Sequence, residues 1–459
     1  MKMIKSVRAV FSDEVFLRKT VMIAVPVAAQ ALLNTVTNMV DTMMIGTLGE
    51  TAIAGVGLAN KVFFVFNLLI FGIASGASVL SAQFWGNHDG KNIRKVLGIS
   101  LILGIIGSLL FTLPSLFAPE AVMRIFTNSP TSVETGAAYL RLACISYPFT
   151  AVTNIYVAAM RSVGRVRTPV VTSLIAIMVN ITLNYALIFG HFGAPAMGVS
   201  GAAVATLTAR VVEVTCIFLY VYGWKTELAA KVSELIGYPK TLIKEYIRTV
   251  LPIIGNEFMW GLGVTMYSLA YGRMGDTSVA AVTIAQTIQD MILVFFQGIS
   301  AASTVILGNE LGAGRIKDAE KDASKLLWLQ FTASILLAAF CIVTRNLLVG
   351  FYDVSETVLK EAAYCMLVYG LFLPFKMFNI VNVVGVLRSG GDTRFCLLLD
   401  SGSVWLIGVP MSFLGALVFR FPIHLVFAMT LTEEFAKFFI GYRRYRKKKW
   451  LKNLAAGVS

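Results

Sequence analysis

Charged side chains are scarce in this chain of 459 residues. Only 14% of the residues are Asp, Glu, Lys or Arg and 57% are hydrophobic, whereas soluble domains carry about 25% charged residues. Histidine occurs three times and cysteine five times, without the spacing of metal ligands. These shortages exclude a soluble globular enzyme, a disordered chain and a nucleic-acid-binding module. They leave a helical membrane protein for which we expect no cofactor and no resident metal.

Long uncharged runs are abundant instead. A helix that crosses a bilayer needs roughly 20 apolar residues, and twelve runs in the sequence meet this need. We therefore predict an all-α polytopic membrane protein whose transmembrane helices occupy residues 20–40, 53–82, 96–118, 135–160, 169–190, 200–223, 249–271, 279–308, 326–344, 358–386, 395–418 and 422–442.

Basic residues are distributed unevenly among the connections between these runs. Of the 39 Lys and Arg residues, 29 lie on the side that holds both chain ends and five lie on the other side. Basic connections stay in the cytoplasm, so we predict that both termini are cytoplasmic. The net charge of +14 then reflects topology and contact with anionic lipid. We expect no nucleic-acid partner for the basic tail, residues 443–459.

The chain repeats itself at an offset of 226–227 residues. Pro26 corresponds to Pro252 and Gly49 to Gly275, and the loop RSVGRVR at 161–167 corresponds to RSGGDTR at 388–394. Each half holds six predicted spans, so both halves enter the membrane from the same side, as a parallel repeat. We predict four parts: an amino-terminal lobe, a cytoplasmic linker, a carboxy-terminal lobe and a tail, at residues 1–222, 223–248, 249–442 and 443–459.

Two equal bundles with a site between them favour alternating-access transport over a channel. A membrane-embedded enzyme is a further alternative. No HExxH motif, Ser/His pair or Asp-rich metal motif lies at membrane depth in the sequence. We therefore predict a protein that is not an enzyme.

Polar residues inside the spans mark candidate functional sites, because burying them in a membrane is costly. The first span carries Gln30, Asn34, Asn38 and Asp41 at spacings of four, four and three, which predicts one shared helix face. The alternative for Gln30, Asn34 and Asn38 is that they only hydrogen-bond to a neighbouring helix. An ionised Asp41 needs a partner, a proton or a cation.

Three further polar residues lie at a depth similar to that of Asp41. Asn180 and Asn184 are four apart in the fifth span, and Thr206 lies a turn or two inside the sixth. A carboxylate with carbonyl and hydroxyl oxygens suits a proton or a small hard cation such as Na⁺. We predict a coupling site of Asp41, Asn180, Asn184 and Thr206. A hydrogen-bonded cluster with a permanently protonated Asp41 is the alternative.

The second half contains its own acids, which leave several alternatives open. One alternative is that Lys61 and Asp290 pair across the cleft, and the other is that each pairs within its own lobe. Asp400 either pairs with loop arginines or takes part in coupling. Arg210 and Glu213, three apart, are predicted to form an internal ion pair. Met and aromatic residues suit a promiscuous pocket for flat lipophilic cations. The candidate cleft residues are Gln30, Asn34, Asn38, Lys61, Glu257, Trp260, Tyr267, Gln286 and Asp290.

Five segments resemble the multidrug and toxic compound extrusion (MATE) transporters, in the right order and over nearly the whole chain. They are PVAAQALLNTVTNMVDTMMIGTLG, VNITLNYALIFG, MGVSGAAVAT, GISAASTVILGNELGAG and GVLRSGGDTRF. The resemblance implies a V-shaped pair of six-helix lobes. Asp41 matches the acid of the first helix in such proteins, and Asn180 and Thr206 match members of the amino-lobe cation cluster. Asn184 departs from relatives with a second Asp there, which favours H⁺ over Na⁺.

The resemblance also implies a function and a location. We expect a secondary active exporter of cationic or amphipathic drugs in the inner membrane of a bacterium, driven by inward flow of H⁺ or Na⁺. Protonation or cation binding at Asp41 would drive the change of access. We expect the chain to act as a monomer in the bilayer. The alternative is a flippase for a lipid-linked or amphipathic metabolite, which would show several basic residues in its cleft.

Overall fold

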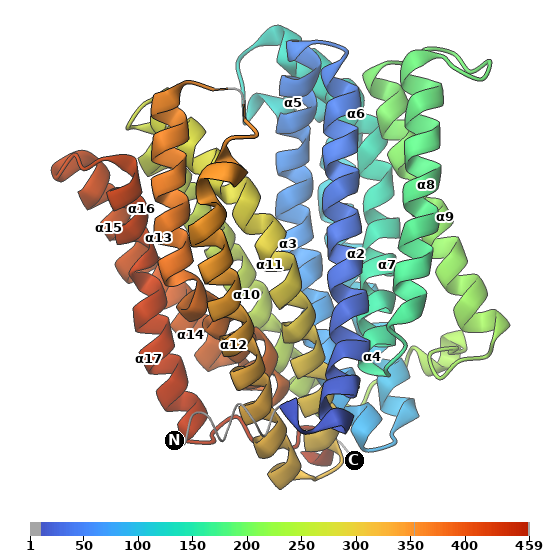
Figure 1. The fold of residues 1–459 in the computed structure, drawn as a ribbon. Helices are drawn as coiled ribbons and strands as arrows, with labels where there is room; N and C mark the ends of the chain where they lie inside the picture. The colour runs from blue at the N-terminus through green and yellow to red at the C-terminus, as the bar shows by residue number, and fades with distance from the viewer. Residues whose placement is uncertain (1–10, 353, 458–459) are drawn as a thin grey trace. The chain divides into compact units, whose positions relative to one another are not determined.

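The computed structural model describes residues 11–352 and 354–457, and every regular element within them is helical (Figure 1). All the predicted spans coincide with helices of these residues. Ten helices in the described residues are long and apolar enough to cross a membrane. The other two predicted spans correspond to α10 (Lys240–Gly272) and to α16 (Ile423–Leu431) followed by α17 (Glu433–Arg446), and this last span is divided into helices of 9 and 14 residues.

Residues 29–246 form one compact unit, to which α2 (Glu14–Gly46) contributes its second part. Within this unit α3 packs against α4, α6 and α7, and α8 packs against α9. Its other helices are α3 (Glu50–Gly86), α4 (Gly90–Phe117), α5 (Pro119–Arg124), α6 (Pro130–Ala143), η1 (Cys144–Ser146), α7 (Tyr147–Ser162), α8 (Arg167–Phe189), α9 (Val199–Gly223) and η2 (Val232–Glu234).

The predicted span 135–160 is one continuous rod in three pieces, because α6 passes through the 3₁₀ turn η1 into α7. Pro148 at the start of α7 has no backbone N–H and cannot complete the bond to the carbonyl four residues earlier. The helix therefore tightens at this point instead of running on as a regular α-helix.

The second compact unit contains residues 247–459 together with the chain up to Ala28. Here α11 and α13 pack against each other and against α12, and α13 also packs against α16 and α17. Its other elements are α11 (Asp276–Gly312), α12 (Ile316–Val349), α13 (Glu356–Ile380), η3 (Val381–Leu387), α14 (Thr393–Ser403), η4 (Val404–Gly408), α15 (Val409–Phe413), η5 (Leu414–Val418) and η6 (Ala455–Gly457).

The structure differs from the predicted parts in two respects. The boundary between them lies inside α2, at Ala28 and two residues beyond Pro26. The predicted linker 223–248 is also helical from Lys240 onward. The lobes at 1–222 and 249–442 describe the sequence repeat, and they stay a prediction.

Three π-helical segments interrupt the last spans of the second unit. These are η3, η4 and η5, which continue α13, α14 and α15 respectively. A π turn inserts an extra residue per turn and re-aims the side chains around it, which is why such turns concentrate at functional sites. Several buried polar residues of this unit lie in or next to these segments, among them Asn379, Asn382, Arg388 and Ser403.

Matching turns join the first two helices of each sequence half. Gly49 precedes α3 with φ 106°, and Gly275 precedes α11 with φ 103°. Residues other than glycine rarely adopt such positive φ angles. The backbone therefore explains why glycine stands at both repeat-equivalent positions.

Ion pairs connect the segments that were predicted to be cytoplasmic. Arg94 and Arg165 bind Glu234 and Glu227 of the linker at 2.6 and 2.8 Å. The Arg165 guanidinium holds the pKa of Glu227 below its usual value of 4.5. In the other unit, Lys325 reaches Asp13 at 2.6 Å, Arg444 reaches Asp392 at 2.6 Å, and Lys448 pairs with Glu320.

These pairs place the connections on one side of each unit, as the charge distribution predicts. Which side faces the cytoplasm stays a prediction. Three basic residues that this argument counts, Lys2, Lys5 and Arg8, lie outside the described residues.

Candidate functional site

The polar face of α2 divides into two groups in the structure. Gln30 Nε2 donates to Ser173 Oγ of α8 at 2.8 Å, and Asp41 accepts from α8 as well. Asn34 and Asn38 are exposed. At about 100° per residue, positions 30 and 41 differ by only about 20° in direction, whereas 34 and 38 rotate progressively away. Asn34 and Asn38 therefore point in a different direction from Asp41, although the spacing predicted one shared helix face.

Asp41 and the two asparagines of α8 meet as predicted. Asn184 Nδ2 donates to Asp41 Oδ1 at 2.6 Å and also lies 3.2 Å from Asn180 Oδ1. Both asparagines are buried and Asp41 is half-buried. No described residue donates to Asn184 Oδ1. The acid therefore sits in an amide-lined site with one acceptor oxygen to spare.

Thr206 joins this site through a residue that sequence reasoning missed. Its hydrogen-bond partner is Tyr139 of α6, a buried phenol on which the charges of Asp41 and Arg210 also act. The only signal in the sequence was a tyrosine within the fourth span. Nothing in its spacing linked that tyrosine to Asp41.

A chain of hydrogen bonds runs beside Asp41. The predicted pair of Arg210 and Glu213 is present, with Nη1 and Oε2 2.7 Å apart. Glu213 Oε1 accepts from Ser173 at 2.7 Å, Ser173 accepts from Gln30, and Gln30 Oε1 accepts from Arg161 at 2.7 Å. The Arg210 charge also acts on Asp41. The amino-terminal site thus contains a fixed cation close to its titratable acid.

Gln30 consequently has its polar atoms engaged inside residues 29–246. Lys61, by contrast, is exposed on α3. Its proposed partner Asp290 belongs to the other unit, so the pairing of these two residues stays a prediction. Within that other unit, the charge of Lys376 acts on Asp290.

The carboxy-terminal candidates fall into two groups. Glu257 is buried, with Oε1 2.9 Å from Arg388 Nη2, and Tyr267 donates to Glu433 Oε2 at 2.7 Å. Trp260 is 39% exposed and Gln286 is half-buried. Glu257 and Tyr267 therefore hold internal polar networks, while the indole of Trp260 is open to contact. Their predicted place in a cleft stays a prediction.

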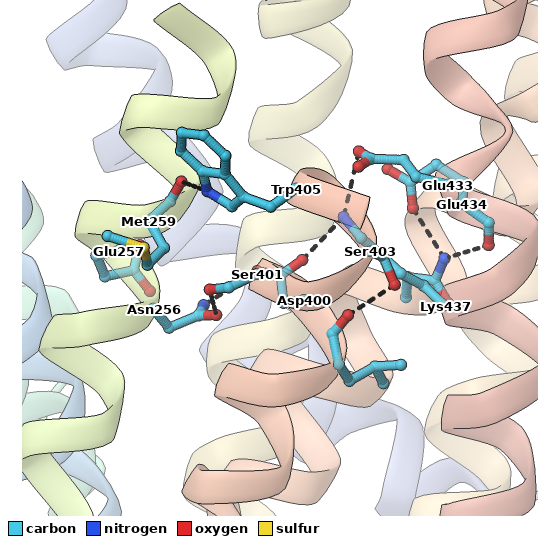
Figure 2. A network of polar contacts seen from close by, with 12 residues as sticks. Asn256, Glu257, Met259, Asp400, Ser401, Ser403, Trp405, Glu433, Glu434 and Lys437 are labelled. Carbon is cyan, nitrogen blue, oxygen red and sulfur yellow. Dashed lines mark hydrogen bonds and ion pairs between the residues drawn. The ribbon is translucent and has the colours of Figure 1, made fainter. Parts of the chain in front are cut away.

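Asp400 belongs to a buried network around Lys437 of α17 (Figure 2). The Lys437 ammonium lies 2.9 Å from Asp400 Oδ1 and 3.3 Å from Glu433 Oε1. Asn256 Nδ2 donates to the other Asp400 oxygen at 3.0 Å, and Asn256 Oδ1 accepts from Ser401. The loop arginine Arg388 binds Glu257 instead. Lys437 of the last span is therefore the ion-pair partner of Asp400, and the loop arginine Arg388 acts on Asp400 through its charge.

Sequence reasoning missed four charged residues of this unit, namely Arg388, Glu433, Glu434 and Lys437. Arg388 was counted with the cytoplasmic loops but its side chain is 1% exposed. Lys437 was one of only five basic residues placed inside spans, and that position was a signal of a buried partner. The partners themselves come from α10 and α14, which are distant in sequence.

Comparison with known proteins identifies the family. The MatE family model matches residues 26–186 and again residues 252–414. Two matches separated by this distance confirm the internal repeat at an offset of 226–227 residues. Together they cover well over half of the chain.

Relatives and solved structures agree along most of the chain. The probable multidrug resistance protein NorM of Thermotoga maritima is 26% identical over 409 residues, covering 88% of this chain and 86% of that protein. The transporter YisQ of Bacillus subtilis is 22% identical over 412 residues, covering 90% of each. A crystal structure of a MATE protein in a bent conformation matches with a TM-score of 0.87 at 20% identity, covering 98% of this chain and 99% of that one.

The structural match shows the predicted all-α fold, and the family match shows what kind of protein carries it. The chain belongs to the MATE family of multi-pass membrane transporters and is not an enzyme.

Proposed function

We propose that this chain is a secondary active antiporter of the bacterial inner membrane, which exports cationic or amphipathic compounds while H⁺ flows inward. One observation carries the proposal. Asp41 is a half-buried acid inside a span, and its direct partner is the neutral amide of Asn184. Relatives named as multidrug resistance proteins occur in Thermotoga maritima and Pseudomonas aeruginosa, which supports drugs as the substrate class.

The contacts of Asp41 favour H⁺ over Na⁺ as the coupling ion. Hard metal cations require several oxygen ligands, but Asn184 turns its nitrogen toward Asp41. A proton needs neither a ligand shell nor room, so it suits the site better than a metal ion does.

Proton uptake would change the contacts that α2 makes with α8. An ionised Asp41 accepts a charge-assisted hydrogen bond from Asn184, and such bonds are about twice as strong as neutral ones. Protonation removes the charge and weakens this bond, while the bond from Gln30 to Ser173 persists. The end of α2 near Asp41 is then released, and Pro26 supplies a position at which the helix can bend.

The same acid would link the proton to the substrate. A cationic substrate is attracted by ionised Asp41 and loses that attraction when Asp41 binds a proton. Proton and substrate therefore compete for one negative charge, which is the thermodynamic requirement for antiport.

Dye uptake into inverted membrane vesicles tests the proposal, with imposed pH or Na⁺ gradients and with wild type compared to Asp41→Asn. We expect uptake driven by the pH gradient and at least a tenfold loss in Asp41→Asn. Asp318→Asn is the matched control, because it removes an exposed carboxylate that pairs with Arg315, and it should transport normally.

Two outcomes contradict the proposal. Uptake that responds only to Na⁺, or that survives Asp41→Asn, excludes proton coupling at this residue. Absence of dye transport under both gradients excludes drug export and favours the movement of a lipid-linked compound.

A further inference from the structure

The last span contains a buried lysine that cannot balance the acids around it. Lys437 and Glu433 have side chains that are 5% and 7% exposed, and Lys437 lies between Asp400 and Glu433 (Figure 2). Glu434 is buried beside them and accepts from Asn379 Nδ2 at 2.8 Å. The cluster therefore joins α10, α13, α14 and α17 in residues 247–457.

The charges of this cluster do not cancel. The acids are Glu257, Asp400, Glu433 and Glu434, and the cations paired with them are Arg388 and Lys437. Full ionisation would leave two negative charges in excess. Uncompensated buried charge is strongly unfavourable. The first turn of α17 offsets part of one charge, because Glu433 and Glu434 lie at the helix N-terminus. More than one negative charge therefore remains to be neutralised.

Among the described residues, no cation other than Lys437 is paired with Glu433 or Glu434; Lys376 of α13 lies over the ring of Tyr369, and its charge acts on Asp290. The titratable groups that face the pair are Tyr267 and Tyr271 of α10, Tyr369 of α13, Asp400 of α14 and Lys437 of α17 itself. Among the described residues, Lys437 is the one cation of this set. Asp400 already accepts from Lys437 and Asn256, so the excess charge falls on the glutamate pair.

Two independent features of the structure surround Glu433 and Glu434 with polar contacts. Gly408 in η4 makes room for the bond from Tyr267 to Glu433, since a Cβ there would lie 2.6 Å from Glu433 Oε2. The amide of Asn379 is buried and its nitrogen donates to Glu434, yet no described residue donates to its oxygen.

We propose that Glu433 and Glu434 form a proton-binding site of the carboxy-terminal unit, in which one of the two carboxyl groups holds an exchangeable proton. Asp400 remains ionised against Lys437. The site is separate from Asp41, and the inference does not depend on the role proposed for Asp41.

Infrared spectroscopy of the purified protein in lipid tests this site directly, because a protonated carboxylic acid has its own carbonyl stretching band. The measurement is made in an Asp41→Asn background, so that failure of the proposed function does not affect it. We expect both Glu433→Gln and Glu434→Gln to remove the intensity of about one acid group. Asp392→Asn is the matched control, because Asp392 is buried but has its own bidentate cation, Arg444, and it should leave the band unchanged.

A third variant should change the intensity of the carbonyl band in the opposite direction. Lys437→Gln removes the cation and leaves a further uncompensated acid, so the band should grow and persist to higher pH. This increase would not occur if the network only held the helices together. Should Lys437→Gln fail to fold, the two glutamine variants still decide the matter.

Three results would overturn the proposal. The first is a band that neither Glu433→Gln nor Glu434→Gln lowers, since both acids would then be ionised. The second is an equal loss in Asp392→Asn. The third is a band that appears only when Na⁺ is replaced by choline, since the cluster would then bind Na⁺ instead of a proton.

Discussion

The side-chain amide of Asn184 donates a 2.6 Å hydrogen bond to Asp41, and this bond connects α8 to α2. The neutral donor determines what the acid can bind. Two adjacent carboxylates share a proton or recruit a cation, whereas a carboxylate beside a neutral amide donor offers a metal cation only one anionic ligand. Position 184 is therefore the place at which ion preference can be altered.

Asn184→Asp should make transport sensitive to Na⁺. The substitution adds a second anionic ligand at hydrogen-bond distance from Asp41. We expect dye uptake by this variant to respond to a Na⁺ gradient at constant pH, while wild type does not respond. Asn184→Ala removes the donor without adding charge, and the loss of a bond to a charged group costs about 1.5–3 kcal/mol. A Na⁺ response already present in wild type would refute the prediction.

The pair of Glu257 and Arg388 should be strongly coupled in stability. Both side chains are buried and their atoms lie 2.9 Å apart. Removing one partner of a buried pair leaves an isolated charge and costs about 3–5 kcal/mol. Arg388→Gln should therefore lower the unfolding temperature more than the double variant with Glu257→Gln. Thermal unfolding in detergent measures this cycle, and additive losses would show that the pair is not coupled.

The attachment of the linker should weaken in acid. The hydrogen bond from Arg165 lowers the pKa of Glu227 from 4.5. A lowered pKa stabilises the folded contact above the unfolded value, and this stabilisation is lost as the pH falls through the folded value. Limited proteolysis of residues 223–240 should therefore accelerate below about pH 4.

Arg165→Gln should expose the linker to protease already at neutral pH, and high salt should have a smaller effect in the same direction because the pair is partly exposed. Arg141→Gln, which breaks the exposed pair with Glu120, is the control. Equal cleavage of wild type and Arg165→Gln at neutral pH would contradict the prediction.

Gly408→Ala should disturb the contact between Tyr267 and Glu433. Its φ of −58° suits any residue, so the effect is one of space alone. The new methyl group would lie 2.6 Å from Glu433 Oε2, and such overpacking costs about 1–3 kcal/mol. Gly402→Ala, where a Cβ meets nothing within 4 Å, is the matched control in the same span. Equal unfolding temperatures for the two variants would show that the space at Gly408 is not needed.

The helical architecture was predictable because the bilayer imposes it on local sequence. Each predicted span contains enough apolar residues to cross a membrane, and each coincides with helical segments of the described residues. Interruptions within spans were less predictable. The 3₁₀ turn η1 follows from Pro148, but the π segments η3 to η5 depend on packing between helices.

The sites were also predictable only where local sequence decides them, and not where the packing between helices does. Asp41, Asn180 and Asn184 could be grouped from helical spacing and membrane depth. Tyr139 could not be added to them, because no sequence pattern indicates which face of α6 meets α9.

The sequence by itself determined the membrane-spanning helices, the internal repeat and an acid in the first span, since these depend on hydrophobic length, repeated Gly and Pro, and helical period. Only the tertiary structure decided which buried charges are partners. Arg388 was expected in a loop and binds Glu257, and Asp400 binds Lys437 of the last span. An ion pair in a membrane protein depends on which helices lie side by side, and that depends on the packing of the whole unit.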